Sequence, residues 1–244
     1  MRTFVGSLSV SLLGLLFSAT AAHAVTVYFN DFETAVGPEL TSTSGPLGID
    51  RTPTGNRGFL GRLDQSPILG LNNETVTLSL SGLAAHTSAT VTLKLFILQS
   101  WDGNNAPGPD IWQAGHSGSL VNLQNTTFGI AQSPQCFPAD CPASNPARTG
   151  ADEPPNSLGY TFFGDSVYDL SYTFAHTGPA FTLQFTASDL QLIEDESWGV
   201  DNLRVEINQA AVPEPMSLLL VALGLAGVAL TRRKRSQAGA ARKV

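Results

Sequence analysis

Side chains that can bind a metal ion through oxygen lie near both ends of the central part of this 244-residue chain. Asp31 and Glu33 follow an apolar, β-branched segment, and Asp201 and Asn202 lie in a similar segment near the end of the same region. Calcium takes about six to eight oxygen ligands from carboxylates, amides and backbone carbonyls. If the two segments pair as strands, these four side chains supply a calcium site. Otherwise they cap turns or lie in water.

A second group of oxygen ligands lies in the middle of the chain, at Asp102, Asn104, Asn105 and Asp110. It offers another position for calcium. Such residues beside Gly and Pro also form ordinary turns, so both interpretations stay open.

Two tryptophans, Trp101 and Trp112, flank this second group. A pyranose ring has an apolar face and a rim of hydroxyls, so a site for it needs an aromatic platform beside polar groups. Either indole could stack on a sugar while Asp102 or Asn104 accepts its hydroxyl protons. Trp198 offers the same chemistry. The alternative for each tryptophan is a place in the core.

Residues for catalysis are harder to find. A glycosidase needs two carboxyl groups about 5–9.5 Å apart across a cleft. The acidic run Glu194–Asp195–Glu196 lies between expected strands and is more simply a solvated turn. The G-x-S-x-G nucleophile motif is absent, and the histidines that follow residue 25 are scattered. We therefore expect no enzyme activity, with glycan cleavage as the remaining catalytic alternative.

The net charge of the central region limits its partners, and its two cysteines can form a disulfide. Residues 25–212 hold 6 Lys and Arg against 19 Asp and Glu, a net charge of −13. Such a field repels nucleic acid and suits a divalent cation or a neutral polymer. Cys136 and Cys141 are expected to form a local disulfide in an oxidising compartment, with free thiols as the alternative.

The elements that must position these residues are expected to be strands. Polar and apolar residues alternate with period two, Gly, Pro, Asn and Asp clusters separate the segments, and no ten-residue stretch after residue 25 has a helical stripe. This pattern predicts an all-β antiparallel sandwich of jelly-roll type over residues 25–208. The expected strands are 25–29, 74–80, 89–98, 160–163, 168–174, 181–185 and 199–207.

The N-terminus has the three parts of a secretory signal peptide. Arg2 is followed by an apolar run from Val5 to Ala19 and by the small-residue site Ala22-His23-Ala24. The run is short for a membrane span, which needs about 20 residues. We expect residues 1–24 to be a signal peptide.

The C-terminus combines a proline motif, an apolar run and a basic cluster. Pro213, Glu214 and Pro215 precede the apolar residues 216–231, and Arg232, Arg233, Lys234 and Arg235 follow. The run can span a bilayer as a helix if the basic side chains extend to the interface, and they then stay on the cytoplasmic side.

These three parts, in this order, resemble the PEP-CTERM sorting domain of Gram-negative bacteria that make extracellular polysaccharide. The resemblance implies recognition by an exosortase, a membrane cysteine protease that would cut near the motif. The expected organisation is a sorting signal over 209–235 and a cytoplasmic tail over 236–244, which is longer than usual for the family. The alternative is a plain membrane anchor that is never processed.

Short motifs in the central region resemble concanavalin-type and carbohydrate-module jelly rolls. They are Asn30-Asp31-Phe32-Glu33, Phe59-Leu60-Gly61, Ser100-Trp101-Asp102-Gly103, Gly108-Pro109-Asp110 and Trp198-Gly199-Val200-Asp201-Asn202. In such modules an acidic residue of the first strand and an aspartate of the last often hold a structural calcium ion. The resemblance thus implies the terminal-strand site.

The expected function is that of an exported, surface-sorted protein of the extracellular polysaccharide matrix, anchored in the membrane before sorting and able to bind glycan with the help of calcium. The alternatives are a structural surface protein without glycan affinity and a glycan-cleaving enzyme.

Overall fold

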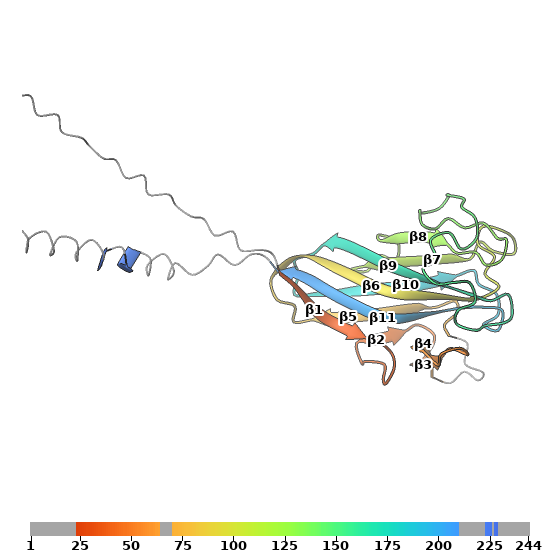
Figure 1. Cartoon of the computed structure of the whole chain (residues 1–244), viewed down its shortest axis with the longest axis horizontal. Coiled ribbons are helices and arrows are strands. Elements are labelled where there is room, and N and C mark those ends of the chain that lie inside the picture. The colour runs from red at the N-terminus through yellow and green to blue at the C-terminus, as the bar shows by residue number, and fades with distance from the viewer. Residues whose placement is uncertain (1–22, 64–69, 210–222, 226, 229–244) are drawn as a thin grey trace, which may run out of the picture. The chain divides into compact units, whose positions relative to one another are not determined.

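Two antiparallel sheets lie face to face in the computed structural model, which describes residues 23–63, 70–209, 223–225 and 227–228 (Figure 1). The first sheet has the order β3 (Leu47–Arg51), β4 (Gly58–Arg62), β11 (Glu196–Gln209), β6 (His86–Gln99), β9 (Asp165–Ala175), and β1 (His23–Asn30) also pairs with β11. The second has the order β2 (Leu40–Ser42), β5 (Thr75–Ser81), β10 (Ala180–Ser188), β7 (Ile111–His116), β8 (Gln124–Thr127). The fold is the expected all-β sandwich.

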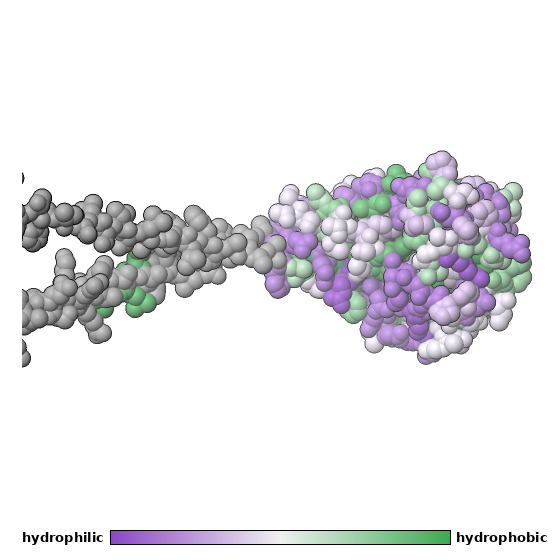
Figure 2. Space-filling view, turned by 45° about the horizontal axis from the view of Figure 1, so that its top comes forward, coloured by the Kyte–Doolittle hydropathy of each residue, from purple (hydrophilic) through white to green (hydrophobic). Residues whose placement is uncertain are grey.

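Alternating side chains build the core between the sheets. In β10 every second residue is apolar and buried, at Phe181, Leu183 and Phe185, while the threonines and the glutamine beside them are only partly covered. This is the period-two pattern of a strand with one face against a core. All three tryptophans of the chain are also fully buried. Outside the core, the face of the sandwich seen in Figure 2 is mainly hydrophilic, with scattered apolar residues.

The first and last strands lie side by side, as the resemblance to carbohydrate-module jelly rolls implied. His23 pairs with Gln209 and Asn30 with Leu203 in antiparallel register. Both ends of the region therefore lie at one end of the sandwich, and the opposite end carries the loops before β7, β9 and β11. Residues 23–210 form one compact unit of the chain.

One expected strand is wrong. Residues 160–163 lie in a loop, because the carboxylate of Asp165 accepts hydrogen bonds from the backbone N–H groups of Leu158 and Tyr160 at 3.1 and 3.2 Å. Phe163 then takes a left-handed backbone conformation with φ of 60°. Five strands had no counterpart among the expected segments, namely β2, β3, β4, β7 and β8.

The signal peptide, the Pro-Glu-Pro motif, the basic cluster and the tail lie outside the described residues, apart from His23 and Ala24, which belong to β1. Of the expected membrane helix the structure describes residues 223–225 and 227–228, which are helical. No helix within the described ranges is long and apolar enough to cross a membrane.

Candidate metal and ligand pocket

Three carboxylates from separate parts of the chain meet at the loop end of the sandwich. Asp102 follows β6, Asp110 immediately precedes β7, and Glu196 is the first residue of β11. One ligand oxygen from each lies within 4.8 Å of the others. Within the described part of the chain, this is the one group of three or more acidic, histidine or cysteine side chains with that spacing. Asp110 and Glu196 are 0% exposed, and Asp102 is partly covered.

A tight turn holds the two aspartates together. The backbone N–H of Asp102 donates to Oδ2 of Asp110, and the N–H of Asp110 donates to the carbonyl of Gly103 at 2.9 Å. Gly103 has φ of 59°, and a Cβ atom there would lie 2.2 Å from the carbonyl oxygen of Pro134. Only glycine fits this position, so the DG dipeptide fixes the path of the turn.

Trp101 joins the turn to strand β11. Its indole N–H donates to the carbonyl of Ser197 at 2.8 Å, directly beside Glu196. Its ring packs edge-on against Phe128, and its own carbonyl accepts from the N–H of Ile130 at 2.9 Å. The side chain that the sequence suggested as a sugar platform is therefore buried and positions the carboxylates instead.

Burial raises the pKa of all three carboxyl groups, so ionising them together is unfavourable. Burial, with the charge of Glu196 next, raises the pKa of Asp110 to about 8. Burial also raises the pKa of Glu196 to about 7. The pKa of Asp102 is raised by burial and by the nearby charge of Asp195. Carboxylates in low dielectric near like charges retain protons unless a cation neutralises them.

The hydrogen-bond donors around the cluster do not reach one buried oxygen of Asp110. The backbone N–H of Gln191 donates to Glu196 at 2.6 Å, and its side-chain amide donates to Asp102 and Glu196 at 3.1 and 3.2 Å. Oδ1 of Asp110 is buried and accepts no hydrogen bond from an N–H or hydroxyl donor. The carboxyl groups of Asp110 and Glu196 are hydrogen-bonded when they share a proton. Two buried carboxyls this close together hold either a proton or a cation.

A pocket of about 320 Å³ opens beside the cluster, with Asp102 in its wall. The pocket is lined by Ser100, Asp102, Pro107, Ile130, Ala131, Ser133, Phe162, Phe163, Gln191 and Asp195. One part of this wall is polar, and the two phenylalanines form an exposed aromatic part. Of the three carboxylates, Asp102 lines the pocket, while Asp110 and Glu196 are buried behind it. Such carboxylates can hold a divalent cation, and a pocket of this volume can hold a small ligand.

The residues expected at the terminal-strand calcium site have other partners. Oε2 of Glu33 accepts from Arg51 at 2.8 Å, and Oδ2 of Asp201 accepts from Arg57 at 3.2 Å. Asp31 Oδ1 accepts from the N–H of Glu33, while Asn202 donates to Asp201. Although the strands pair, Asp31, Glu33 and Asp201 do not form a group with metal-ligand spacing among the described residues.

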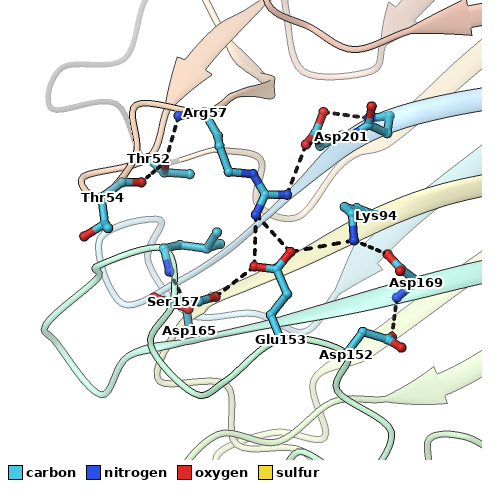
Figure 3. Close-up of polar contacts among 12 residues, drawn as sticks. Thr52, Thr54, Arg57, Lys94, Asp152, Glu153, Ser157, Asp165, Asp169 and Asp201 are labelled. Carbon is cyan, nitrogen blue, oxygen red and sulfur yellow. Dashed lines mark hydrogen bonds and ion pairs between the residues drawn. The ribbon is translucent and has the colours of Figure 1, made fainter.

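Arg57 occupies the centre of this region (Figure 3). Its Nη1 donates to both oxygens of Glu153, at 2.9 and 3.0 Å, and its Nη2 reaches Asp201. Lys94 links Glu153 to Asp169, with Nζ–O distances of 3.6 and 2.5 Å. The guanidinium carbon also lies 4.8 Å from the centre of the Phe96 ring. A protein cation thus neutralises the aspartate for which calcium was expected.

The remaining expected site residues lie away from the pocket. Trp112 is fully buried and stacks on Phe185, with ring centres 5.9 Å apart. Asn104 accepts from Thr127 at 2.5 Å and donates to a backbone carbonyl at 3.1 Å, and it does not line the pocket. Asn105 is exposed. A disulfide joins Cys136 and Cys141.

Three functional candidates were missed from the sequence. Glu196 was assigned to a solvated turn, although the β pattern that begins at Gly199 continues back to it as strand β11. Phe162 and Phe163 were assigned to a strand. Two adjacent aromatics followed by Gly164 break period-two alternation, because neighbours in a strand face opposite sides. That break was the available signal for an exposed aromatic loop.

Fold and pocket together define a β-sandwich domain with a pocket and an acidic cluster at one end of the sandwich. Residues 211–235 match the family described as the PEP-CTERM protein-sorting motif. The chain therefore carries a PEP-CTERM motif, which implies an exported protein that an exosortase recognises. No curated protein matches the sequence.

Several solved structures match this chain at low identity and with low TM-scores. A family GH115 4-O-methyl-α-glucuronidase is 10% identical with a TM-score of 0.34, and the match covers 77% of this chain but only 19% of that one. A family 35 carbohydrate-binding module from Clostridium thermocellum is 9% identical, with a TM-score of 0.34 and coverage of 75% and 98%. The mannan-recognising module TmCBM27 is 13% identical, with a TM-score of 0.34 and coverage of 77% and 100%. Likenesses at this level transfer no function.

Proposed function

We propose that this protein is a non-catalytic, surface-sorted component of the extracellular polysaccharide matrix whose sandwich binds glycan through a calcium ion held by Asp102, Asp110 and Glu196. The observation that carries the proposal is a cluster of three carboxylates, two of them fully buried, in which Oδ1 of Asp110 has no N–H or hydroxyl donor. A divalent cation would satisfy that oxygen and offset the cluster's charge.

Three carboxylates fill only part of the coordination shell of calcium, which takes six to eight oxygens. The remaining positions fall to water or to hydroxyl groups of a ligand in the adjoining pocket. A pair of neighbouring sugar hydroxyls fits this role because both are neutral oxygen donors. The domain's net charge of −13 also favours a neutral glycan or one bridged by a cation.

The terminal-strand residues Asp31, Glu33, Asp201 and Asn202 remain a second proposed calcium position. There Arg51 and Arg57 already supply positive charge to two of the carboxylates. The pocket cluster has no such cation among its hydrogen-bond partners in the described residues. We therefore place calcium in the pocket first.

The test is thermal unfolding of residues 23–210 in calcium and in chelator. An extracellular calcium site with a dissociation constant of about 0.1–1 mM, at about 10 mM calcium, stabilises by roughly 1–3 kcal/mol, or about 3–10 °C for a domain of this size. Asp110→Asn should keep the fold and lose this shift. Asp31→Asn is the matched control and should keep it.

A wild-type melting temperature that is identical in calcium and in chelator would refute the cation site. Loss of the shift in Asp31→Asn, with retention in Asp110→Asn, would move calcium to the terminal strands. Retention in both variants would exclude both positions.

A further inference from the structure

Phe162 and Phe163 form an exposed aromatic pair on the wall of the pocket. Their side chains are 53% and 56% exposed, and their ring centres lie 4.7 Å apart at an angle of 77°. Both rings line the pocket that contains Asp102 and Gln191. Two large adjacent apolar side chains left in water beside a polar pocket indicate a binding surface.

The loop that carries the pair is held in an unfavourable backbone conformation. Phe163 has φ of 60°, a region that bulky side chains rarely adopt. Nη2 of Arg148 donates to the carbonyl of Phe163 at 3.4 Å, and its Nε donates to Ser166 at 3.1 Å. Gly164, with φ of 105°, allows Asn156 to approach closely. Glycine would suit position 163 better, so the phenylalanine there carries a backbone cost.

The polar part of the wall complements this aromatic pair. Ser100 donates to Oδ1 of Asp195 at 2.5 Å, and Gln191 donates to Asp102 at 3.1 Å. Carboxylate and amide oxygens accept hydroxyl protons, while the phenyl faces suit C–H groups. A pyranose ring presents both kinds of surface, with an apolar face and a rim of hydroxyls.

The size of the pocket limits what can enter it. At about 320 Å³ it lies at the lower end of small-molecule sites, which range over about 300–1,000 Å³. A groove for the middle of a polymer would have to be longer and open at both ends. One sugar ring is the unit that suits this volume.

We propose that the pocket takes a single pyranose unit at the end or on a branch of a glycan, stacked on Phe162 and Phe163 with its hydroxyls toward the Asp102 side. This inference rests on the proposed calcium-dependent glycan binding and specifies its ligand and its aromatic contacts. The two phenylalanines are binding residues that contact the sugar directly.

The experiment measures binding of methyl glycopyranosides of glucose, galactose and mannose to residues 23–210 by NMR titration in calcium. Phe162→Ala and Phe163→Gly should each weaken binding roughly 2- to 10-fold, the range of a lost aromatic contact. Phe163→Gly should not lower the melting temperature, because glycine suits its backbone. Val121→Ala, at another exposed apolar residue, is the control and should bind normally.

Each other outcome overturns the inference in a recognisable way. If calcium binds and the organism's polysaccharide binds, but no glycoside does, the single-ring pocket is wrong. If both Phe variants bind glycosides as tightly as wild type, the aromatic contact is wrong. If vesicles of anionic phospholipid bind in calcium and compete with the glycosides, the pair inserts into lipid instead. Failure of calcium binding itself refutes the underlying function.

Discussion

Glu196 and Gln209 are the first and last residues of one strand, β11. The strand has 14 residues, so at about 3.3 Å per residue it spans roughly 43 Å from the carboxylate cluster to the point where the chain leaves the sandwich. The matched sorting motif begins at residue 211, two residues beyond the strand. The carboxylate cluster and Gln209, the last residue of β11, therefore lie at opposite ends of the sandwich.

The pH dependence of stability should report the buried carboxyls. Burial raises the pKa of Asp110 to about 8 and of Glu196 to about 7, above the unfolded values near 4. The folded state then holds protons that the unfolded state has lost, so this contribution is full below pH 4 and disappears as pH rises through 7 to 8. In chelator, we expect the melting temperature to fall from pH 6.5 to 8.5.

The chosen pH range avoids histidine effects. Burial lowers the pKa of His116 and His176 below 6.5, which makes stability rise with pH only below that value. Each carboxyl contributes at most about 1.4 kcal/mol per pH unit. Asp110→Asn should flatten the decline, and calcium should suppress it. A melting temperature that does not change over this range in chelator would contradict the proposed proton retention.

Arg57 should matter more to stability than its exposed counterpart, Arg51. Arg57→Met leaves Asp201, which is 4% exposed, without its cation, and it also removes the two hydrogen bonds from Nη1 to Glu153. We expect a loss of about 2–3 kcal/mol, less than for a fully buried pair because the arginine is partly exposed. Arg51→Met breaks a surface pair and should cost at most about 1 kcal/mol.

Chemical denaturation of the two variants gives their free energies of unfolding. The comparison holds if the dependence of this free energy on denaturant concentration is the same in both variants. Equal losses in free energy of unfolding would show that Arg57 is no more than a surface charge. A larger loss for Arg51→Met would contradict the network drawn in Figure 3.

Sorting should depend on the matched segment and not on the basic residues beyond it. Replacing Pro213 and Pro215 with alanine should leave full-length protein in the membrane fraction, because the motif falls inside the match. Arg242→Ala, outside residues 211–235, is the matched control and should be processed as wild type. Immunoblotting of cell, membrane and medium fractions distinguishes the two. Normal release of the double proline variant would argue against processing at this motif.

Alternation predicted the sandwich, because period two is a local property of each segment, whereas the pairing of its first and last strands was implied by the resemblance to carbohydrate-module jelly rolls. Alternation missed β3 and β4, whose glycines and charged residues interrupt the apolar pattern. The tryptophan platform was an expectation from residue type, and whether an indole is exposed depends on packing that forms only in three dimensions. The structure places Trp101 and Trp112 in the core.

The pocket could be predicted only in part for a similar reason. Asp102 and Asp110 lie close in the sequence and were proposed as calcium ligands, but Glu196 reaches them through the pairing of β11 with β6, where it faces Gln99. Contacts between segments a hundred residues apart leave no local pattern. At the terminal strands, the ion pair between Asp201 and Arg57, from the loop before β4, could not be predicted from the sequence either.

The most direct test of calcium-dependent glycan binding is co-sedimentation of residues 23–210 with the source organism's own extracellular polysaccharide, in calcium and in chelator. We predict that wild type pellets with the polysaccharide in calcium only, that Asp110→Asn stays in solution in both buffers, and that Asp31→Asn behaves as wild type. Absence of binding in both buffers, or equal binding of wild type with and without calcium, would contradict the proposal.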